Sequence, residues 1–231
     1  VVTGDIALAG RKQEFAEAAA WFADAPGPIV ACPGDDDAPA FALMQRMSSP
    51  FRRHRQLGLL THWTDAHRQA AIASFNSARA AQWRPSWSQG VYSLKHVQAA
   101  VDAASKAAPQ GWRIIACHHP PVTPSGGPLL ARTRRGAAAV RMVRDQRRLI
   151  QLAGHVQSFT VNRRGEAVFV TAPSLASRRT RGQGWGFVAL MLGAQDATAT
   201  LWTYDGAAFA PTQRVSLIGP IHGGEAGHIA M

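Results

Sequence analysis

The sequence predicts an α/β fold in which two β-sheets pack against each other. Before Ser158, apolar runs typical of buried strands alternate with stretches that have the spacing of helices. After Ser158, short strand-like runs separated by turn residues follow one another, as in antiparallel hairpins. A third observation is that short polar motifs begin where several apolar runs end. Strands that alternate with helices in the first part of the chain, followed by hairpins in the second part, predict two sheets in one domain.

Each predicted strand is a short apolar run bounded by polar or turn residues. Most of the early strands are followed directly by a polar motif, which is typical of strands that end at a functional edge. The later ones form two hairpins, the first with a turn at residues 162–165. We expect the early strands at residues 1–3, 29–32, 69–76, 112–117 and 149–153, and the hairpin strands at 159–161, 167–171, 187–192 and 198–204.

The predicted helices lie between these strands. Residues 14–22 place Phe15, Trp21 and Phe22 at helical spacing, and residues 88–108 contain an amphipathic helix. Residues 38–56 start with a helical pattern and become polar. Residues 132–148 read as a basic helix. We expect one domain over residues 1–218, followed by a loose, glycine-rich tail at 219–231.

The chain is strongly basic. Its 231 residues carry a formal net charge of +11, with 46% apolar and 17% charged residues. Basic surfaces favour anionic partners such as phosphate esters, nucleotides, nucleic acid or acidic membranes. The alternative is that the positive charge has no specific partner and only makes the surface of a soluble protein rich in arginine. Much of the excess lies in residues 132–148 and in Arg178, Arg179 and Arg181, without the interleaved aromatics of a single-strand binder. We therefore expect a small phosphate ester or nucleotide as partner rather than nucleic acid.

The two cysteines, Cys32 and Cys117, do not make a disulfide framework. Both lie in predicted core strands, where a cysteine serves as a small apolar residue. A chain of this kind is typical of a reducing compartment, and we expect a cytoplasmic protein. No apolar run is long enough to span a membrane, and no signal peptide is visible. The sequence carries no signal for an oligomeric state.

Four polar motifs carry the chemistry. Aspartate and histidine side chains that converge from the carboxyl ends of several strands are the usual material of a metal site. Each motif alone is weak, since Gly-Asp after a strand is also a common turn or helix cap. The motifs are Gly4-Asp5, Pro33-Gly34-Asp35-Asp36-Asp37, His118-His119-Pro120-Pro121 and Gly154-His155-Val156-Gln157.

The order of these motifs resembles the calcineurin-like metallophosphoesterases. That family has Asp-x-His, Gly-Asp, Gly-Asn-His-Asp/Glu, a His often written His-His-Pro, and Gly-His-x-His; four of these five blocks can be laid on this chain. Residues 75–79 and 172–174 also look like segments of the bacterial cyclic-nucleotide phosphodiesterase-like branch. The resemblance implies a four-layer α-β-β-α sandwich of two mixed sheets, with the metal site at the C-terminal ends of strands. The first block, absent here, would normally supply the first strand, so residues 1–3 would form an exposed edge.

The resemblance also implies a ligand set. Asp5 matches the aspartate that bridges two metals, His118 the single histidine ligand, and His155 the first histidine of Gly-His-x-His. Asp35 replaces an asparagine ligand, which adds negative charge and should hold a cation more tightly. Two carboxylates and two imidazoles suit Mn, Fe, Zn or Co.

The departures from the family pattern fall mainly on the residues that would bind the second metal. The Asp-x-His block is absent, and Gln157 stands where the last histidine ligand would be, so we expect one ion bound well and a second poorly or not at all. Asp36 replaces the catalytic histidine that contacts the phosphate or protonates the leaving group. His119 would be a catalytic neighbour near the substrate, and Asn76 and Arg79 would contact the phosphate.

Three functions remain open on the sequence. The first is a metal-dependent phosphoesterase that hydrolyses phosphodiesters or phosphomonoesters with metal-activated water. The second is a degenerate relative that binds a metal or a phosphorylated ligand without turnover, as Asp36 and Gln157 would favour. The third is a nucleic-acid-binding protein that uses the basic helix at 132–148. Turnover lost on chelation would support the first, and a steep salt dependence of binding the third.

Overall fold

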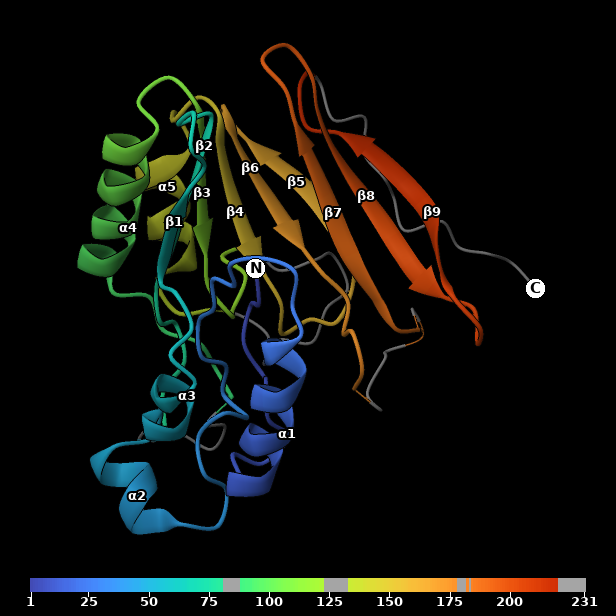
Figure 1. Cartoon of the computed structure of the whole chain (residues 1–231). Helices are drawn as coiled ribbons and strands as arrows, with labels where there is room; N and C mark the ends of the chain where they lie inside the picture. Colours follow the sequence, from blue (N-terminus) through green and yellow to red (C-terminus); the bar gives the residue numbers. More distant parts are fainter. Residues whose placement is uncertain (81–87, 123–132, 178–181, 183, 220–231) are drawn as a thin grey trace.

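Two sheets lie face to face in the computed structural model, which describes residues 1–80, 88–122, 133–177, 182 and 184–219. Helices cover the other face of the larger sheet (Figure 1). The predicted α/β class with two packed sheets is therefore confirmed. Most of the predicted tail and part of the arginine-rich segments lie outside the described residues, namely residues 220–231, Arg132, Arg178, Arg179 and Arg181.

The larger sheet is mixed and has the strand order β1-β2-β3-β4-β6-β5. Strands β2, β3, β4 and β6 run parallel, and the edge strands β1 and β5 are antiparallel to their neighbours. Because the central strands are parallel, their carboxyl ends meet at one edge of the sheet. The strands are β1 (His62–Thr64), β2 (Ala70–Ser74), β3 (Trp112–Ala116), β4 (Leu149–Ala153), β5 (Thr160–Arg164) and β6 (Ala167–Thr171).

The smaller sheet is antiparallel, with β7 (Gly186–Leu192), β8 (Ala197–Tyr204) and β9 (Phe209–Ser216) in sequence order. The alternating residues of β8 bury Ala199 and Leu201 against Ile150 and Val168 of the larger sheet. The predicted hairpin of β7 and β8 is present. Strand β9 was not predicted, because its residues are nearly all exposed and give no alternating apolar pattern.

Helices α4 (Leu94–Ala107) and α5 (Gly136–Val143) cover the free face of the larger sheet. Val97 and Val101 of α4 belong to the same core cluster as Ile115 and Leu149 of the sheet. Helix α5 is shorter than the predicted basic helix at 132–148. Among the described residues no helix covers the outer face of the smaller sheet, so three layers of the predicted α-β-β-α sandwich are seen (Figure 1).

The remaining helices lie beyond the carboxyl ends of the parallel strands (Figure 1). They are α1 (Lys12–Ala23), α2 (Leu43–Ser48) and α3 (Arg52–Gln56). None of the helices in the described ranges has the length and apolar character needed to cross a membrane.

The two predicted strands nearest the N-terminus are reduced to single bridges. Val2 pairs with Ala31, and Val30 pairs with Leu60, both in parallel. The Val2 amide donates to the Val30 carbonyl at 2.8 Å, and the Cys32 amide donates to the Val2 carbonyl at 3.1 Å. The strands predicted at 1–3 and 29–32 are therefore shorter than expected. These bridges place the two segments that follow, each with an aspartate, beside the larger sheet.

Candidate metal centre

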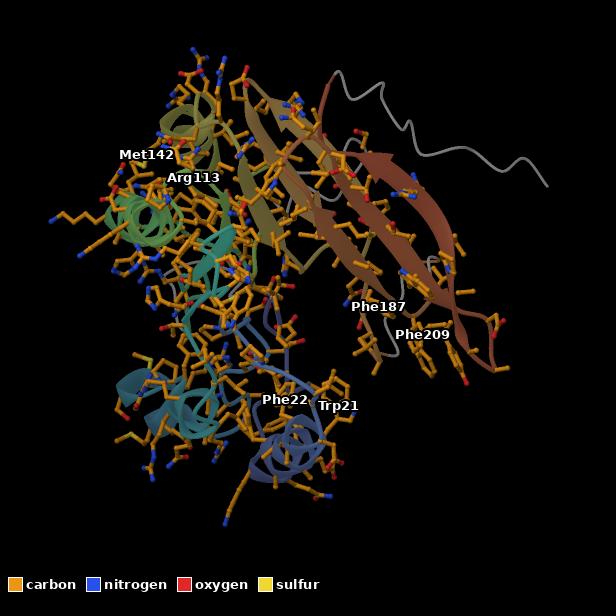
Figure 2. All side chains as sticks on the ribbon, turned by 45° about the horizontal axis from the view of Figure 1, so that its top comes forward. Trp21, Phe22, Arg113, Met142, Phe187 and Phe209 are labelled. Carbon is orange, nitrogen blue, oxygen red and sulfur yellow. The ribbon has the colours of Figure 1, made fainter. Side chains whose placement is uncertain are left out.

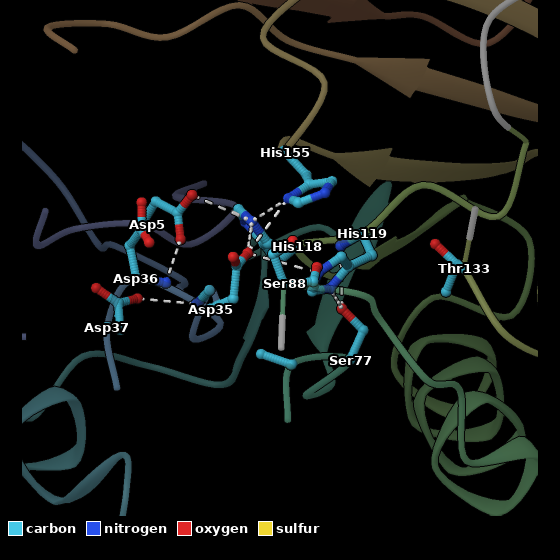
Figure 3. Close-up of polar contacts among 12 residues, drawn as sticks. Asp5, Asp35, Asp36, Asp37, Ser77, Ser88, His118, His119, Thr133 and His155 are labelled. Atoms are coloured by element: carbon cyan, nitrogen blue, oxygen red, sulfur yellow. Dashed lines mark hydrogen bonds and ion pairs between the residues drawn. The ribbon is translucent and has the colours of Figure 1, made fainter. Parts of the chain in front are cut away.

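Three chain segments bring acidic and imidazole groups together at the carboxyl edge of the larger sheet. Asp35 follows the Ala31 bridge, His118 and His119 follow β3, and His155 follows β4. One donor atom from each of these four side chains lies within 4.8 Å of the others. Figure 3 shows them turned toward one another, with Asp5 alongside. The predicted convergence of motifs is therefore present in the structure.

Asp35 lies at the middle of the cluster and its side chain is 11% exposed. Its Oδ1 atom is 3.0 Å from His118 Nε2, 3.2 Å from His155 Nδ1 and 3.5 Å from His119 Nε2. Burial would raise the pKa of Asp35, but the three imidazoles around it hold that pKa well below its usual range. None of these contacts gives Oδ1 a hydrogen bond of good geometry. A buried carboxylate oxygen without a hydrogen bond, among imidazole nitrogens, is a suitable place for a cation.

His118 presents one nitrogen to the cluster. Its Nδ1 atom lies 2.7 Å from the Thr3 carbonyl oxygen, which can only accept, so Nδ1 carries the proton. Nε2 then faces Asp35 and Asp5, with Asp5 Oδ2 at 3.2 Å. Burial would lower the pKa of His118, but the two carboxylates raise it well above its usual value. A ring nitrogen held by a carbonyl, with the other facing carboxylates, is the arrangement of metal-binding histidines.

His119 is held differently, although it belongs to the same group of donor atoms. Its Nε2 donates to the Ser88 carbonyl oxygen at 2.9 Å, and Nδ1 lies 3.0 Å from the Ser77 hydroxyl. The His119 amide also donates to Ser77 Oγ at 3.0 Å. Burial lowers the pKa of His119 to about 4, so the ring is neutral at pH 7. With both ring nitrogens engaged, His119 is a weaker candidate ligand than Asp5, and its predicted contact with substrate stays a prediction.

Asp5 enters the cluster on a tightly packed, left-handed turn. Its φ is 54°, a conformation that costs a non-glycine residue about 1 kcal/mol or more. The preceding Gly4 has a φ of 90°, and a Cβ on Gly34 would lie 2.1 Å from Asp5 Oδ1. His155 also has a positive φ, 62°. Strain at two of the predicted ligands is typical of residues held in place for function rather than stability.

The three consecutive aspartates have three different surroundings. Asp35 faces the histidines, whereas the Asp36 amide donates to Asp5 Oδ1 at 3.1 Å. Asp37 is fully buried and accepts from the amides of Ala7 and Gly34, each at 2.8 Å. Burial raises the pKa of Asp37 to about 7. Asp37 therefore ties the segment after Asp5 to the segment before Asp35, a role that the sequence did not reveal. The one signal in the sequence was that Asp37 lies three residues after Gly34, a spacing at which an aspartate side chain can accept a hydrogen bond from a backbone amide in a turn.

The remaining predicted site residues have different surroundings. The Oε1 atom of Gln157 is buried without a hydrogen-bond partner. Asn76 Oδ1 accepts from the Ala78 amide at 2.8 Å and so holds a local turn. Arg79 is exposed. Both lie close in sequence to Ser77, which contacts His119, and their contact with a phosphate stays a prediction.

Comparison with solved structures gives a distant similarity in fold. No protein-family model matches the chain, and no curated protein sequence matches it. A crystal structure of a single-residue mutant of Vps29 from Entamoeba histolytica aligns over 93% of this chain and 97% of its own, at 13% identity and a TM-score of 0.38. At this identity and TM-score the similarity is too low to transfer a function.

Proposed function

We propose that this chain is a metal-dependent phosphoesterase of the calcineurin-like type that hydrolyses phosphodiesters or phosphomonoesters. The observation that supports it most is the cluster of donor atoms of Asp35, His118 and His155 at one edge of the sheet, with Asp5 Oδ2 3.2 Å from His118 Nε2. We assign these four side chains as ligands of one divalent ion, of which Mn, Fe, Zn and Co suit the donors. Such an ion neutralises phosphate charge and lowers the pKa of a bound water.

The arrangement of the donor atoms fits the binding of a single metal ion. Among the described residues one group of histidine, cysteine and carboxylate side chains has donor atoms close enough to hold a metal. Gln157 stands at the position predicted to have lost a histidine ligand of a second ion. The proposal is therefore one resident ion per chain.

The chain's own groups would position the phosphate and move protons. His119, fixed by Ser77 and Ser88, shapes the side of the site next to Asp35. Arg79 is exposed and can reach an anion from solvent. Asp36, partly buried beside Asp5, replaces the histidine expected there, and an ionised carboxylate at this place repels a phosphate. We therefore expect slow turnover.

The second candidate is a degenerate relative that binds a metal or phosphorylated ligand without turnover. Asp36 and Gln157 favour it, because each removes a histidine that the resemblance associates with catalysis or with a second ion. The intact ligand set favours the first candidate.

The cyclic-nucleotide branch, suggested by residues 75–79 and 172–174, is a finer proposal about the substrate. Cytoplasmic localisation likewise stays a prediction, consistent with two buried, unpaired cysteines.

Hydrolysis of bis(p-nitrophenyl) phosphate in the presence of Mn²⁺ tests the proposal. We expect turnover that falls by at least about a hundredfold in the Asp5→Ala, His118→Ala double variant. A His96→Ala variant is the control, because His96 is an exposed histidine on α4. p-Nitrophenyl phosphate, tested in parallel, separates monoesterase from diesterase activity.

Two results would count against the phosphoesterase. Turnover that survives in the double variant would place the chemistry elsewhere or in a contaminant. No turnover by folded protein that holds its metal would favour the binding protein instead. Metal content must therefore be measured on the same samples.

A further inference from the structure

A cavity lies at the end of the sheets opposite to the metal centre. Its volume is about 500 Å³, and it opens between the beginnings of β3 and β6, the loop before β4 and the turn from β7 to β8. In Figure 2 the top of Figure 1 is turned toward the viewer and Arg113 is labelled at this end. Arg113 and His118 are five positions apart on and after β3, so the two sites are separated by about 15 Å. Charged lining residues are Arg113, Arg147, Arg148, Arg163 and Glu166.

The cavity carries an excess of positive charge. Of the described residues that line it, four are arginines and only Glu166 has a carboxylate. The single ion pair there is long, with Arg147 Nε 3.9 Å from Glu166 Oε2, and its two side chains are 85% and 55% exposed. An ion pair of this kind neutralises little charge. The other three guanidinium groups have no carboxylate facing them among the lining residues.

Backbone carbonyls hold these guanidinium groups in place without neutralising them. Arg148 donates to the carbonyl oxygens of Gln110 at 2.6 Å and Ala194 at 3.0 Å. Arg163 donates to the Leu217 carbonyl, and Arg113 donates to the Arg147 carbonyl. Because side chains from distant segments are already ordered, an anion that binds here does not have to order them.

Two buried donors in this region lack partners. The Nε atoms of Arg113 and Arg163 are buried and have no hydrogen-bond acceptor in the described structure. Burial, followed by the nearby charge of Arg148, lowers the pKa of Arg113. Fixed, mutually repelling cations would be stabilised by an anion with several oxygens beside them.

We propose that this cavity binds a small polyphosphate anion, either free or as the phosphate tail of a nucleotide. Guanidinium groups recognise phosphate oxygens in pairs, and several of them together match an anion with more than one phosphate. The volume lies within the range of small-molecule sites. Trp112, Val168 and Leu217 add an apolar wall for a part of the ligand that is not charged. The proposal is independent of the metal centre.

Calorimetric titration of the full chain with tripolyphosphate, in EDTA and at low salt, tests this site. We expect saturable binding with one ligand per chain. Arg147→Gln combined with Arg148→Gln should weaken it by about tenfold or more, because two charged donors are lost. Glu166→Gln should tighten it by roughly twofold to fivefold, because it removes the one repelling carboxylate. A purely structural role of these residues would not produce tighter binding.

Controls separate this site from general charge attraction and from the metal centre. Arg141→Gln removes an exposed arginine of α5 that does not line the cavity, and binding should change by less than about twofold. The Asp5→Ala, His118→Ala variant should bind tripolyphosphate as the parent does. Titrations with ATP and adenosine identify the source: ATP tighter than tripolyphosphate indicates a nucleotide, and equal affinity indicates the free anion.

Four outcomes would overturn the proposal. Three of them are no saturable binding at millimolar tripolyphosphate, an equal loss of affinity in Arg141→Gln, and adenosine that binds as well as ATP. If the double arginine variant does not fold, Arg147→Gln alone replaces it, since that side chain is largely exposed and its loss leaves the packing intact. Unchanged affinity in Arg147→Gln together with unchanged affinity in Glu166→Gln would also refute the site.

Discussion

The Nδ1 atom of His118 lies 2.7 Å from the backbone carbonyl oxygen of Thr3, 115 positions earlier in the chain. This hydrogen bond settles which ring nitrogen is protonated and leaves Nε2 facing the carboxylates of Asp5 and Asp35. The same short segment is joined through Val2 to Val30 and Cys32. The N-terminal residues are therefore part of the scaffold of the candidate metal centre.

Replacing Asp35 by asparagine should weaken metal binding by about tenfold or more. Asparagine keeps an oxygen at the position but removes the negative charge nearest the three imidazoles. Titration with Mn²⁺ or Zn²⁺ measures the change, and Asp102→Asn, an exposed carboxylate on α4, is the control. We expect one tightly held ion in the parent chain. Two tightly held ions, or equal affinity in Asp35→Asn, would contradict the assignment.

Gly34→Ala should displace Asp5 from the centre. A Cβ at Gly34 would meet the Asp5 amide nitrogen at 2.4 Å as well as its carboxylate, so backbone must shift. We expect a loss of stability of about 1–3 kcal/mol and weaker metal binding. Gly27→Ala is a matched control, because nothing lies within 4 Å of the added Cβ. Metal affinity that is the same in both variants would show that Asp5 is not a ligand.

Asp36→His should raise phosphodiesterase activity. The change replaces a carboxylate that repels phosphate with a group that can donate a proton, and a well-placed acid contributes roughly a hundredfold or more. Rates with bis(p-nitrophenyl) phosphate should be compared at equal metal content. If the rate does not rise in a metal-loaded sample, Asp36 is not what limits the rate of hydrolysis.

Asp37→Ala should destabilise the fold by about 2–5 kcal/mol. It leaves the amides of Ala7 and Gly34 buried without an acceptor. Asp37→Asn keeps one acceptor oxygen and should lose about half as much. Urea unfolding in EDTA measures the effect without a contribution from bound metal, with Asp102→Ala as the exposed control. A loss below about 0.5 kcal/mol in Asp37→Ala would rule out the bracing role.

His54 should make the fold sensitive to mild acid. Burial lowers its pKa from 6.5 to about 4, only partly offset by a hydrogen bond to the backbone of Cys32. Because the unfolded chain takes up the proton more readily, the neutral ring stabilises the fold fully above pH 6.5. That contribution, about 3 kcal/mol, is lost as the pH falls through 4.

Unfolding free energies of the parent and His54→Gln, at about pH 7.5 and about pH 4.5, test this titration. The parent should lose about 2 kcal/mol more stability between the two conditions than the variant does. His119 shifts in the same direction in both proteins, so the difference isolates His54. His96→Gln, an exposed histidine, should behave as the parent. An equal pH dependence in the parent and His54→Gln would contradict the prediction.

The sequence by itself predicted the central strands and most of the cluster. Strand β4 begins and ends where predicted, because a continuous apolar run between turn residues marks a buried parallel strand. Since such strands end at one edge, the aspartate and histidine motifs after them had to lie together. Strand β6 also has the predicted bounds, but it was expected only in a hairpin, whereas it pairs with β5 in antiparallel and with β4 in parallel. Prediction was poorer at residues 1–3 and 29–32 and for β9. At residues 1–3 and 29–32, strand pairing depends on partners from distant segments. Strand β9 has no apolar pattern, because nearly all its residues are exposed.

Only the tertiary structure decided what each polar group contacts. Neighbouring residues in one motif face different partners, so Asp37 braces the backbone while Asp35 faces the imidazoles, and His119 bonds to two serines while His118 bonds to Thr3. The arginine cavity joins residues from β3, the loop before β4, β5 and the end of the smaller sheet, which no local pattern connects. Periodicity records which side chains are buried, whereas the packing of distant segments determines which charges meet.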